Sequence, residues 1–279
     1  MKTIKTILVL CVALCFVTSC KKDVDMTLMQ KTVLENADIR QIEVGDAWQV
    51  TVVADSNTYV ELEYSAHLEP YLKAKMGGTR LEIGFTGNVR PVINSEFRAT
   101  VHTSKIEKIE AEDASELSFT GHFSATSDSL IIHLEDASVC SGLDYSGHEC
   151  KMVIEDASQF LGFHLTSTNG EIRVSDASTC KGHFDLQFHL VADLSSASRL
   201  ITFGGAAPNA MIKLQDASLL NMAQTEVREI HANLSGASEA TVQVSSRLEG
   251  MLTEASTLYY KGSPQLNVDC SDDSQLIPF

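Results

Sequence analysis

From about residue 105 to the C-terminus, apolar and polar positions alternate, and the alternation recurs about every twenty residues. Segments such as IIHLE, IRVSD and IKLQD alternate with a period of two, which is typical of strands with one buried face. Each ends in a short motif that closes with serine, and successive serines are 18 to 23 residues apart. No segment after residue 105 shows a convincing helical period. The repeat predicts a solenoid of stacked strands.

Two apolar columns flank each motif, one four residues before the serine and one two residues after it. Apolar columns on both sides of a turn are expected when the same side chains line the inside of successive coils. We therefore predict an all-β fold, a right-handed parallel β-helix of about nine coils of 18–23 residues, preceded by an antiparallel β region. The coils would stack about 4.8 Å apart.

The motif reads EDAS, SDAS, SSAS or QDAS in six copies and then SGAS, TEAS and SDDS. Asp, Ser and Gly suit a sharp turn, Ala suits a crowded corner, and a serine hydroxyl can donate to a neighbouring coil and accept from the backbone. A catalytic serine would be single and would have its own base. We interpret the motif as a structural corner ladder made of Asp113, Ser115, Asp136, Ser138, Asp156, Ser158, Asp176, Ser178, Ser198, Asp216, Ser218, Ser238, Ser256 and Ser274.

Two alternatives for the corners stay open. Calcium could bind between stacked carboxylates, because it takes oxygen ligands, although Ser196 and Gly236 interrupt the Asp column. Catalysis by one of the serines is the second alternative. The structural interpretation predicts neither a catalytic residue nor a metal site.

Residues 36–104 lack the repeat. WQVTVVA, YVELEYS, LKAKM, RLEIGF and FRATVHT read as strands of an antiparallel region, with a two-residue hairpin at Gly77–Gly78. We expect this region to cap the solenoid of residues 105–279, because an open solenoid end exposes apolar side chains and unpaired strands.

The N-terminus has the pattern of an export signal. Two lysines precede an apolar run that is too short to span a bilayer, and VTSC resembles a bacterial lipobox. We predict a signal peptide at residues 1–19, acylation of Cys20, and a linker to residue 35; ordinary cleavage is the alternative. The predicted location is the outer membrane, at the cell surface or the periplasmic face, with the membrane as a partner through the lipid anchor.

Composition excludes several kinds of chemistry. The formal net charge of −16 argues against nucleic acid as a partner. Histidines form neither a HExxH motif nor a regular column, no cysteine pair has zinc spacing, and no phosphate-binding or nucleophile-elbow fingerprint occurs. No cofactor is predicted. Carboxylates such as Asp144 and Asp185 could form a catalytic pair in a cleft. The sequence does not distinguish such a pair from carboxylates on the solvated surface.

The cysteines after Cys20 are predicted to be free. Cys140 and Cys180 share a column but lie two coils apart, about 9.6 Å at the usual strand spacing. A disulfide requires Cα atoms within about 7 Å. Cys150 lies outside both columns.

The chain resembles the auto-transporter adhesin head GIN domain family. The residues that carry the resemblance are IRQIEVGDAWQVTVVAD, LEPYLKAKMGGTRLEIGF, RATVHTSKIEKIEAEDASELSF and the later SGAS-like corners. The resemblance implies an exported bacterial protein with a β-helical body and an adhesive role, without catalytic residues. Asp stands where many corners of the family have Gly.

These observations favour a cell-envelope lipoprotein that acts as a non-catalytic binding scaffold, an adhesin with a glycan or protein ligand at the cell surface. One alternative is a carbohydrate-active β-helix enzyme, either a polysaccharide lyase or a hydrolase. Another is a structural envelope protein without a discrete ligand.

Overall fold

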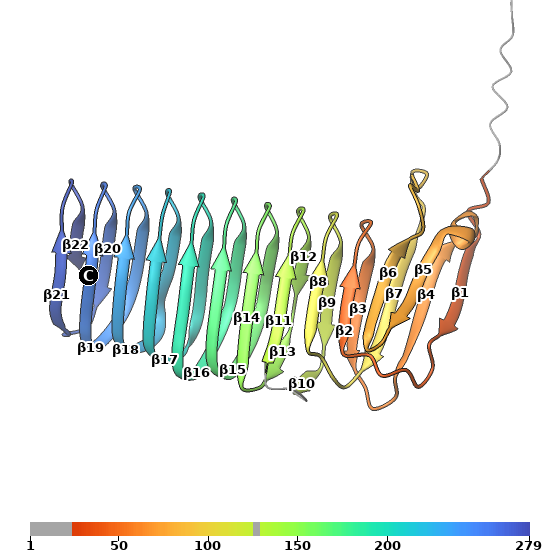
Figure 1. Cartoon of the computed structure of the whole chain (residues 1–279), viewed down its shortest axis with the longest axis horizontal. Coiled ribbons are helices and arrows are strands. Elements are labelled where there is room, and N and C mark those ends of the chain that lie inside the picture. The colour runs from red at the N-terminus through yellow and green to blue at the C-terminus, as the bar shows by residue number, and fades with distance from the viewer. Residues whose placement is uncertain (1–23, 125–128) are drawn as a thin grey trace, which may run out of the picture.

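The computed structural model describes residues 24–124 and 129–279. It is 66% strand and 2% helix and forms a β-solenoid of about eight turns, with antiparallel strands at the N-terminal end. The predicted fold class is confirmed (Figure 1). The sequence predicted about nine coils, one for each repeated corner, whereas the structure has about eight turns. The signal segment and Cys20 lie outside the described residues.

Each strand of the solenoid pairs in parallel with the equivalent strand of the next coil. Leu134 pairs with Ile154, Ile154 with Val174, and Val174 with Leu194, so equivalent repeat positions stack directly. The strands are β8 (Lys108–Ala111), β9 (Glu116–Thr120), β10 (His122–Ser124), β11 (Ser129–Leu134), β12 (Val139–Ser141), β13 (Asp144–Ser146), β14 (Glu149–Ile154), β15 (Gln159–Val174), β16 (Thr179–Leu194), β17 (Arg199–Leu214), β18 (Leu219–Leu234), β19 (Glu239–Leu252), β20 (Thr257–Lys261), β21 (Gln265–Cys270) and β22 (Gln275–Pro278).

The N-terminal region contains both antiparallel and parallel strands. β1 (Leu28–Val33) pairs antiparallel with β4 (Tyr59–Ser65), and β5 (Leu72–Gly77) pairs antiparallel with β6 (Arg80–Phe85). A 3-10 helix, Ala66–Tyr71, joins β4 to β5. The β5–β6 hairpin was predicted, but its turn is Gly78–Thr79, one residue later than expected, with Gly78 in the left-handed region at φ 70°.

Two early strands belong to the parallel stack. β2 (Gln41–Val44) pairs in parallel with β6 and β8, and β3 (Gln49–Ala54) pairs in parallel with β7 (Phe97–Thr103) and β9. The coil formed by β2 and β3 therefore lies between β6–β7 and β8–β9 (Figure 1). The parallel stack begins within the region that the sequence predicted to be antiparallel.

The corner of this early coil has the geometry of the repeated corners. Asp46 and Ala47 have φ values of 57° and 58°, and Ala47 N–H donates to Asp113 O at 2.9 Å in the next coil. Trp48 occupies the serine position and is fully buried, with its ring centroid 5.5 Å from that of Phe85. The stretch GDAW is thus an additional corner in which an aromatic ring fills the N-terminal end of the core.

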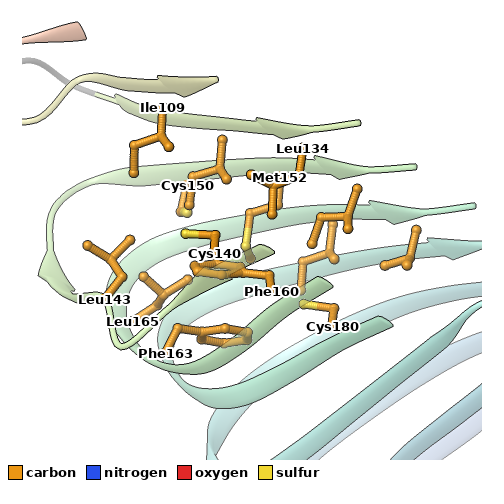
Figure 2. Packing of buried hydrophobic residues seen from close by; sticks show 14 of the residues in the cluster. Ile109, Leu134, Cys140, Leu143, Cys150, Met152, Phe160, Phe163, Leu165 and Cys180 are labelled. Atoms are coloured by element: carbon orange, nitrogen blue, oxygen red, sulfur yellow. The ribbon is translucent and has the colours of Figure 1, made fainter. Parts of the chain in front are cut away.

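The core lies between the strands before and after each corner. Figure 2 shows Leu134 and Met152 from strands before the corners, with Cys140, Phe160 and Cys180 from strands after them. All five are buried because the alternation turns every second side chain inward. Burial of side chains of this size stabilises the fold by about 1.5–3 kcal/mol each.

No helix in residues 24–124 and 129–279 is long and apolar enough to cross a membrane.

Candidate ligand-binding surface

The repeated corner is a tight turn with two left-handed residues. Asp156 has φ 54° and Ala157 has φ 61°, and Ser158 N–H donates to Glu155 O at 3.2 Å. Positive φ at both central residues is the pattern of a type I′ turn, which favours Asn, Asp and Gly. Ala157 N–H donates to Asp176 O at 2.9 Å in the next coil, so the turns are also bonded to one another.

The serines of the ladder are buried, apart from a partly exposed Ser274. Ser138 Oγ donates to Ala111 O at 2.9 Å, and Ser198 Oγ donates to Val174 O at 2.7 Å. Each acceptor lies four residues before the serine of the preceding coil. The structure thus places the serine hydroxyls between coils, beneath the turns.

The serines also accept hydrogen bonds along the ladder. Ser138 N–H donates to Ser158 Oγ, and Ser158 N–H donates to Ser178 Oγ, both at 3.1 Å. Ser115 Oγ, by contrast, is buried without a hydrogen-bond partner. A hydroxyl that is bonded to main-chain groups between coils is suited to a structural role, because it is closed off from a substrate.

The ladder aspartates lie on the outside of the corners. Asp113, Asp136, Asp156, Asp176 and Asp216 are all exposed. The structure separates each Asp side chain from the serine of its own motif, since one faces solvent and the other is buried. An acid, a small residue and a serine that adjoin in the sequence therefore do not form one reactive site.

The four cysteines in residues 24–124 and 129–279 are free, and the column spacing predicted this for Cys140 and Cys180. Cys140, Cys150 and Cys180 are buried, and burial raises the pKa of the Cys150 thiol to about 12. Cys270, in the last coil, is exposed. The three buried thiols are held in their neutral form and serve as small core side chains.

A groove runs across β14 to β19 on the face formed by the strands before the corners. It has a volume of about 640 Å³. Cys150, Leu190, Ala210 and Ile230 line the groove between its two walls, and their side chains are buried in the core. Two outward columns form its walls: Glu149, Asn169, His189, Asn209, Glu229 and Arg247 on one side, and Lys151, Glu171, Val191, Met211, His231 and Glu249 on the other.

The groove is apolar at its centre and charged towards its ends. Val191 and Met211 stand at outward positions of the strands, where polar side chains are usual. Their side chains are 37% and 56% exposed. Lys151 lies 3.4 Å from Glu171 towards one end, and Arg247 lies 2.6 Å from Glu229 towards the other. The hydrogen bond that Arg247 donates to Glu229, with the nearby Glu249 charge, raises the pKa of Arg247, so this end of the groove keeps a fixed positive charge.

The sequence carries a signal for this groove that is independent of the repeated corners. Val191 and Met211 stand seven residues before Ser198 and Ser218. In the adjoining repeats this position holds Lys151, Glu171, His231 and Glu249, and in the repeat before Lys151 it holds Ile131. Apolar residues at an outward position of a strand are exposed in the monomer. Two of them in consecutive repeats indicate a binding surface.

Residues 38–264 match the protein family described as "Putative auto-transporter adhesin, head GIN domain". The chain belongs to this family. No curated protein matches the chain.

Solved structures share the fold. A protein described as a putative adhesin from Parabacteroides merdae is 13% identical, with 92% of this chain and 98% of that chain covered and a TM-score of 0.69. A second such protein, from Parabacteroides distasonis, is 15% identical over the same shares, with a TM-score of 0.65. A protein from P. distasonis described as a putative lipid binding protein is 13% identical over the same shares, with a TM-score of 0.63.

Proposed function

We propose that this chain is a cell-envelope lipoprotein that acts as a non-catalytic binding scaffold, and that the groove across β14–β19 is its ligand surface. The observation that carries the proposal is the exposed apolar centre formed by Val191 and Met211 between charged ends. Exposed apolar surface with a polar rim is typical of interaction sites. Family membership and the resemblance to structures described as adhesins support an adhesive role at the cell surface.

The groove suits an extended part of a macromolecule, such as a glycan chain or a peptide segment. It crosses six coils, which correspond to about 24 Å at the usual strand spacing. Wall side chains supply donors and acceptors at every coil, while Val191 and Met211 supply apolar contact at the centre. A ligand that crosses several coils would gain contacts from each of them.

The contacts of the groove carboxylates favour binding over hydrolysis. Glu229 pairs with Arg247, and Glu171 pairs with Lys151 and with Arg173. A glycosidase needs one carboxyl group that stays protonated to act as an acid. Glu171 and Glu229 instead each contact a basic side chain, which suits them to bind and orient a ligand.

The test is a matched pair of methionine variants. Met211 lies in the groove and is 56% exposed, whereas Met251 lies outside it and is 54% exposed. The wild-type chain is screened on a glycan array and a panel of extracellular matrix proteins, and Met211→Glu is expected to weaken the strongest interaction tenfold or more. Loss of about 1.5–3 kcal/mol of apolar contact corresponds to at least that factor. Met251→Glu should bind like the wild type.

The same preparations are incubated with the polysaccharides of the array. Release of shortened chains by the wild type would contradict the non-catalytic proposal and support the carbohydrate-active alternative. Equal binding by Met211→Glu and the wild type would show that the groove is not the ligand surface. Absence of any ligand would favour the structural envelope protein.

A further inference from the structure

Histidines and carboxylates from four consecutive coils meet on the part of the coil that follows the corners. His122 in β10 pairs in register with Asp144 in β13, and Asp144 pairs with His164 in β15. His164 in turn pairs with His183 in β16, two residues before Asp185. Since adjacent parallel strands lie about 4.8 Å apart, these outward side chains contact one another from coil to coil.

Three of these side chains converge on one point. His183 Nε2 lies 3.0 Å from Asp185 Oδ2, and His164 Nε2 lies 3.5 Å from the same oxygen. One ligand atom from each residue lies within 4.8 Å of the others. A tetrahedral zinc ion with bonds of 2.0–2.1 Å holds its ligand atoms about 3.3 Å apart. The observed distances of 3.0 and 3.5 Å lie on either side of this spacing.

The second nitrogen of His164 faces a carboxylate. His164 Nδ1 lies 3.6 Å from Asp144 Oδ1, and the same oxygen lies 3.2 Å from His122 Nδ1. Histidines that bind metals commonly donate their other ring N–H to a carboxylate, which fixes the tautomer and the orientation of the ring. Asp144 stands where such a positioning residue is required.

The next coil leaves the site uncovered. Gly204 and Gly205 stand beside it, and a Cβ on Gly204 would lie 3.3 Å from His183 Cε1. A Cβ on Gly205 would lie 3.2 Å from Asp185 Oδ1. The side chains of His164, His183 and Asp185 are 50%, 34% and 45% exposed, so solvent reaches the point where a fourth ligand would bind.

We propose that His164, His183 and Asp185 bind one divalent transition-metal ion such as zinc, and that Asp144 orients His164. Two imidazoles and one carboxylate suit zinc, nickel or copper, whereas calcium and magnesium prefer oxygen ligands alone. The acidic chain, with a formal net charge of −16, adds a general attraction for cations. This site lies outside the groove and does not depend on the proposed function.

The structure also supplies a matched control. His133, Glu135 and Glu155 form a second group of possible ligands, with His133 Nε2 2.9 Å from Glu155 Oε1. The side chain of His133 is 33% exposed, close to the 34% of His183. This group has a single imidazole, so it is a poorer match for zinc.

The experiment is calorimetric titration of zinc chloride into the full chain, without an affinity tag that binds metal. We expect one equivalent of zinc to bind. His164→Ala, His183→Ala and Asp185→Asn should each weaken the affinity tenfold or more, and Asp144→Asn should weaken it by about 10- to 100-fold, as for other second-layer carboxylates. His133→Ala should bind zinc like the wild type. Melting curves without zinc establish that each variant is folded.

A second readout identifies the ligands directly. The histidine ring signals in carbon–proton correlation spectra should move for His164 and His183 on addition of zinc, and those of His133 and His231 should not. Equal zinc affinity in His164→Ala and the wild type would overturn the proposal, as would loss of binding in His133→Ala alone. Failure of the folded wild type to bind zinc at millimolar concentration would overturn it as well.

Discussion

At the scale of single residues, the corner motif is explained by backbone conformation. Asp and Ala both take positive φ in the turn, a region that costs most residues about 1–2 kcal/mol and in which Asp and Asn are tolerated better than other non-glycine residues. Gly236, with φ 63°, stands in the Asp position of its corner, where an added Cβ would lie 2.7 Å from Asp216 N. The hydrogen bond from each Ala N–H to the next coil offsets part of this conformational cost.

Two serines of the same ladder should respond differently to removal of the hydroxyl. Ser138 Oγ donates to Ala111 O and contacts Ser158 Oγ, whereas Ser115 Oγ is buried without a partner. Ser138→Ala should lower the free energy of unfolding by about 1 kcal/mol. Ser115→Ala should leave it unchanged or raise it, because an unbonded buried hydroxyl is itself destabilising. Urea unfolding of both variants tests this, and equal losses in the two would contradict it.

At the scale of strands and turns, the sequence predicted the repeat well because equivalent residues stack directly. Prediction fails where the register shifts. Between Leu161 and Phe163, β15 shifts by one residue against β16, and Gly162 has φ 64° at that point. His164 is six residues after its serine and His183 five after its own, so a search for a regular histidine column misses two residues that pair in space.

A second failure arose at the N-terminal end. GDAW lacks the serine that marks the other corners. Its coil is followed in sequence by β4 and β5, and by β6 and β7 on one side of it, before the chain reaches β8 on the other side. The spacing between this corner and the next is therefore irregular. Because Trp48 stands at the serine position, the motif does not match the repeated corners. The turn residues Asp46 and Ala47 were the remaining signal, because their backbone conformation is that of the repeated corners.

The corner aspartates should repel one another rather than share calcium. The side chains of Asp136, Asp156 and Asp176 are exposed on adjacent turns. The strand spacing places these turns about 4.8 Å apart. Like charges at that distance cost about 1 kcal/mol or less in water, and salt reduces the cost. Asp156→Asn should therefore raise the melting temperature slightly at low salt, and calcium chloride should leave the wild-type melting temperature unchanged.

Asp193→Asn is the control for this test, because Asp193 is also solvent-accessible but lies 4.0 Å from Lys213 Nζ. It should not stabilise the chain at low salt. A calcium-dependent rise of several degrees in the wild type that is lost in Asp156→Asn would instead show that the carboxylates hold calcium between coils.

At the scale of the whole molecule, the fold is a rod with different ends. β1, β4 and β5 lie at the end where the described chain begins, and β21 and β22 lie at the other (Figure 1). The groove is built from β14 to β19, in the half of the rod away from β1. A lipid at Cys20 would hold the β1 end near the membrane and leave the groove on the distant half, where a macromolecular ligand meets little obstruction.

This arrangement predicts that anchoring and ligand binding separate cleanly. The sequence VTSC followed by charged residues predicts acylation of Cys20, and mass spectrometry of the mature N-terminus should find a lipid-modified Cys20. Several acyl chains on one residue suffice for stable membrane attachment. Cys20→Ser should therefore move the chain out of the membrane fraction, while Cys15→Ser, within the signal segment, should not.

Because the groove lies far along the rod from the anchor, Cys20→Ser should retain full affinity for any ligand that Met211→Glu loses. The reverse should also hold, with Met211→Glu remaining in the membrane fraction. A mature chain that begins at another residue without lipid would contradict the predicted anchor. A loss of ligand binding in Cys20→Ser, measured in detergent on folded protein, would contradict the separation of the two ends.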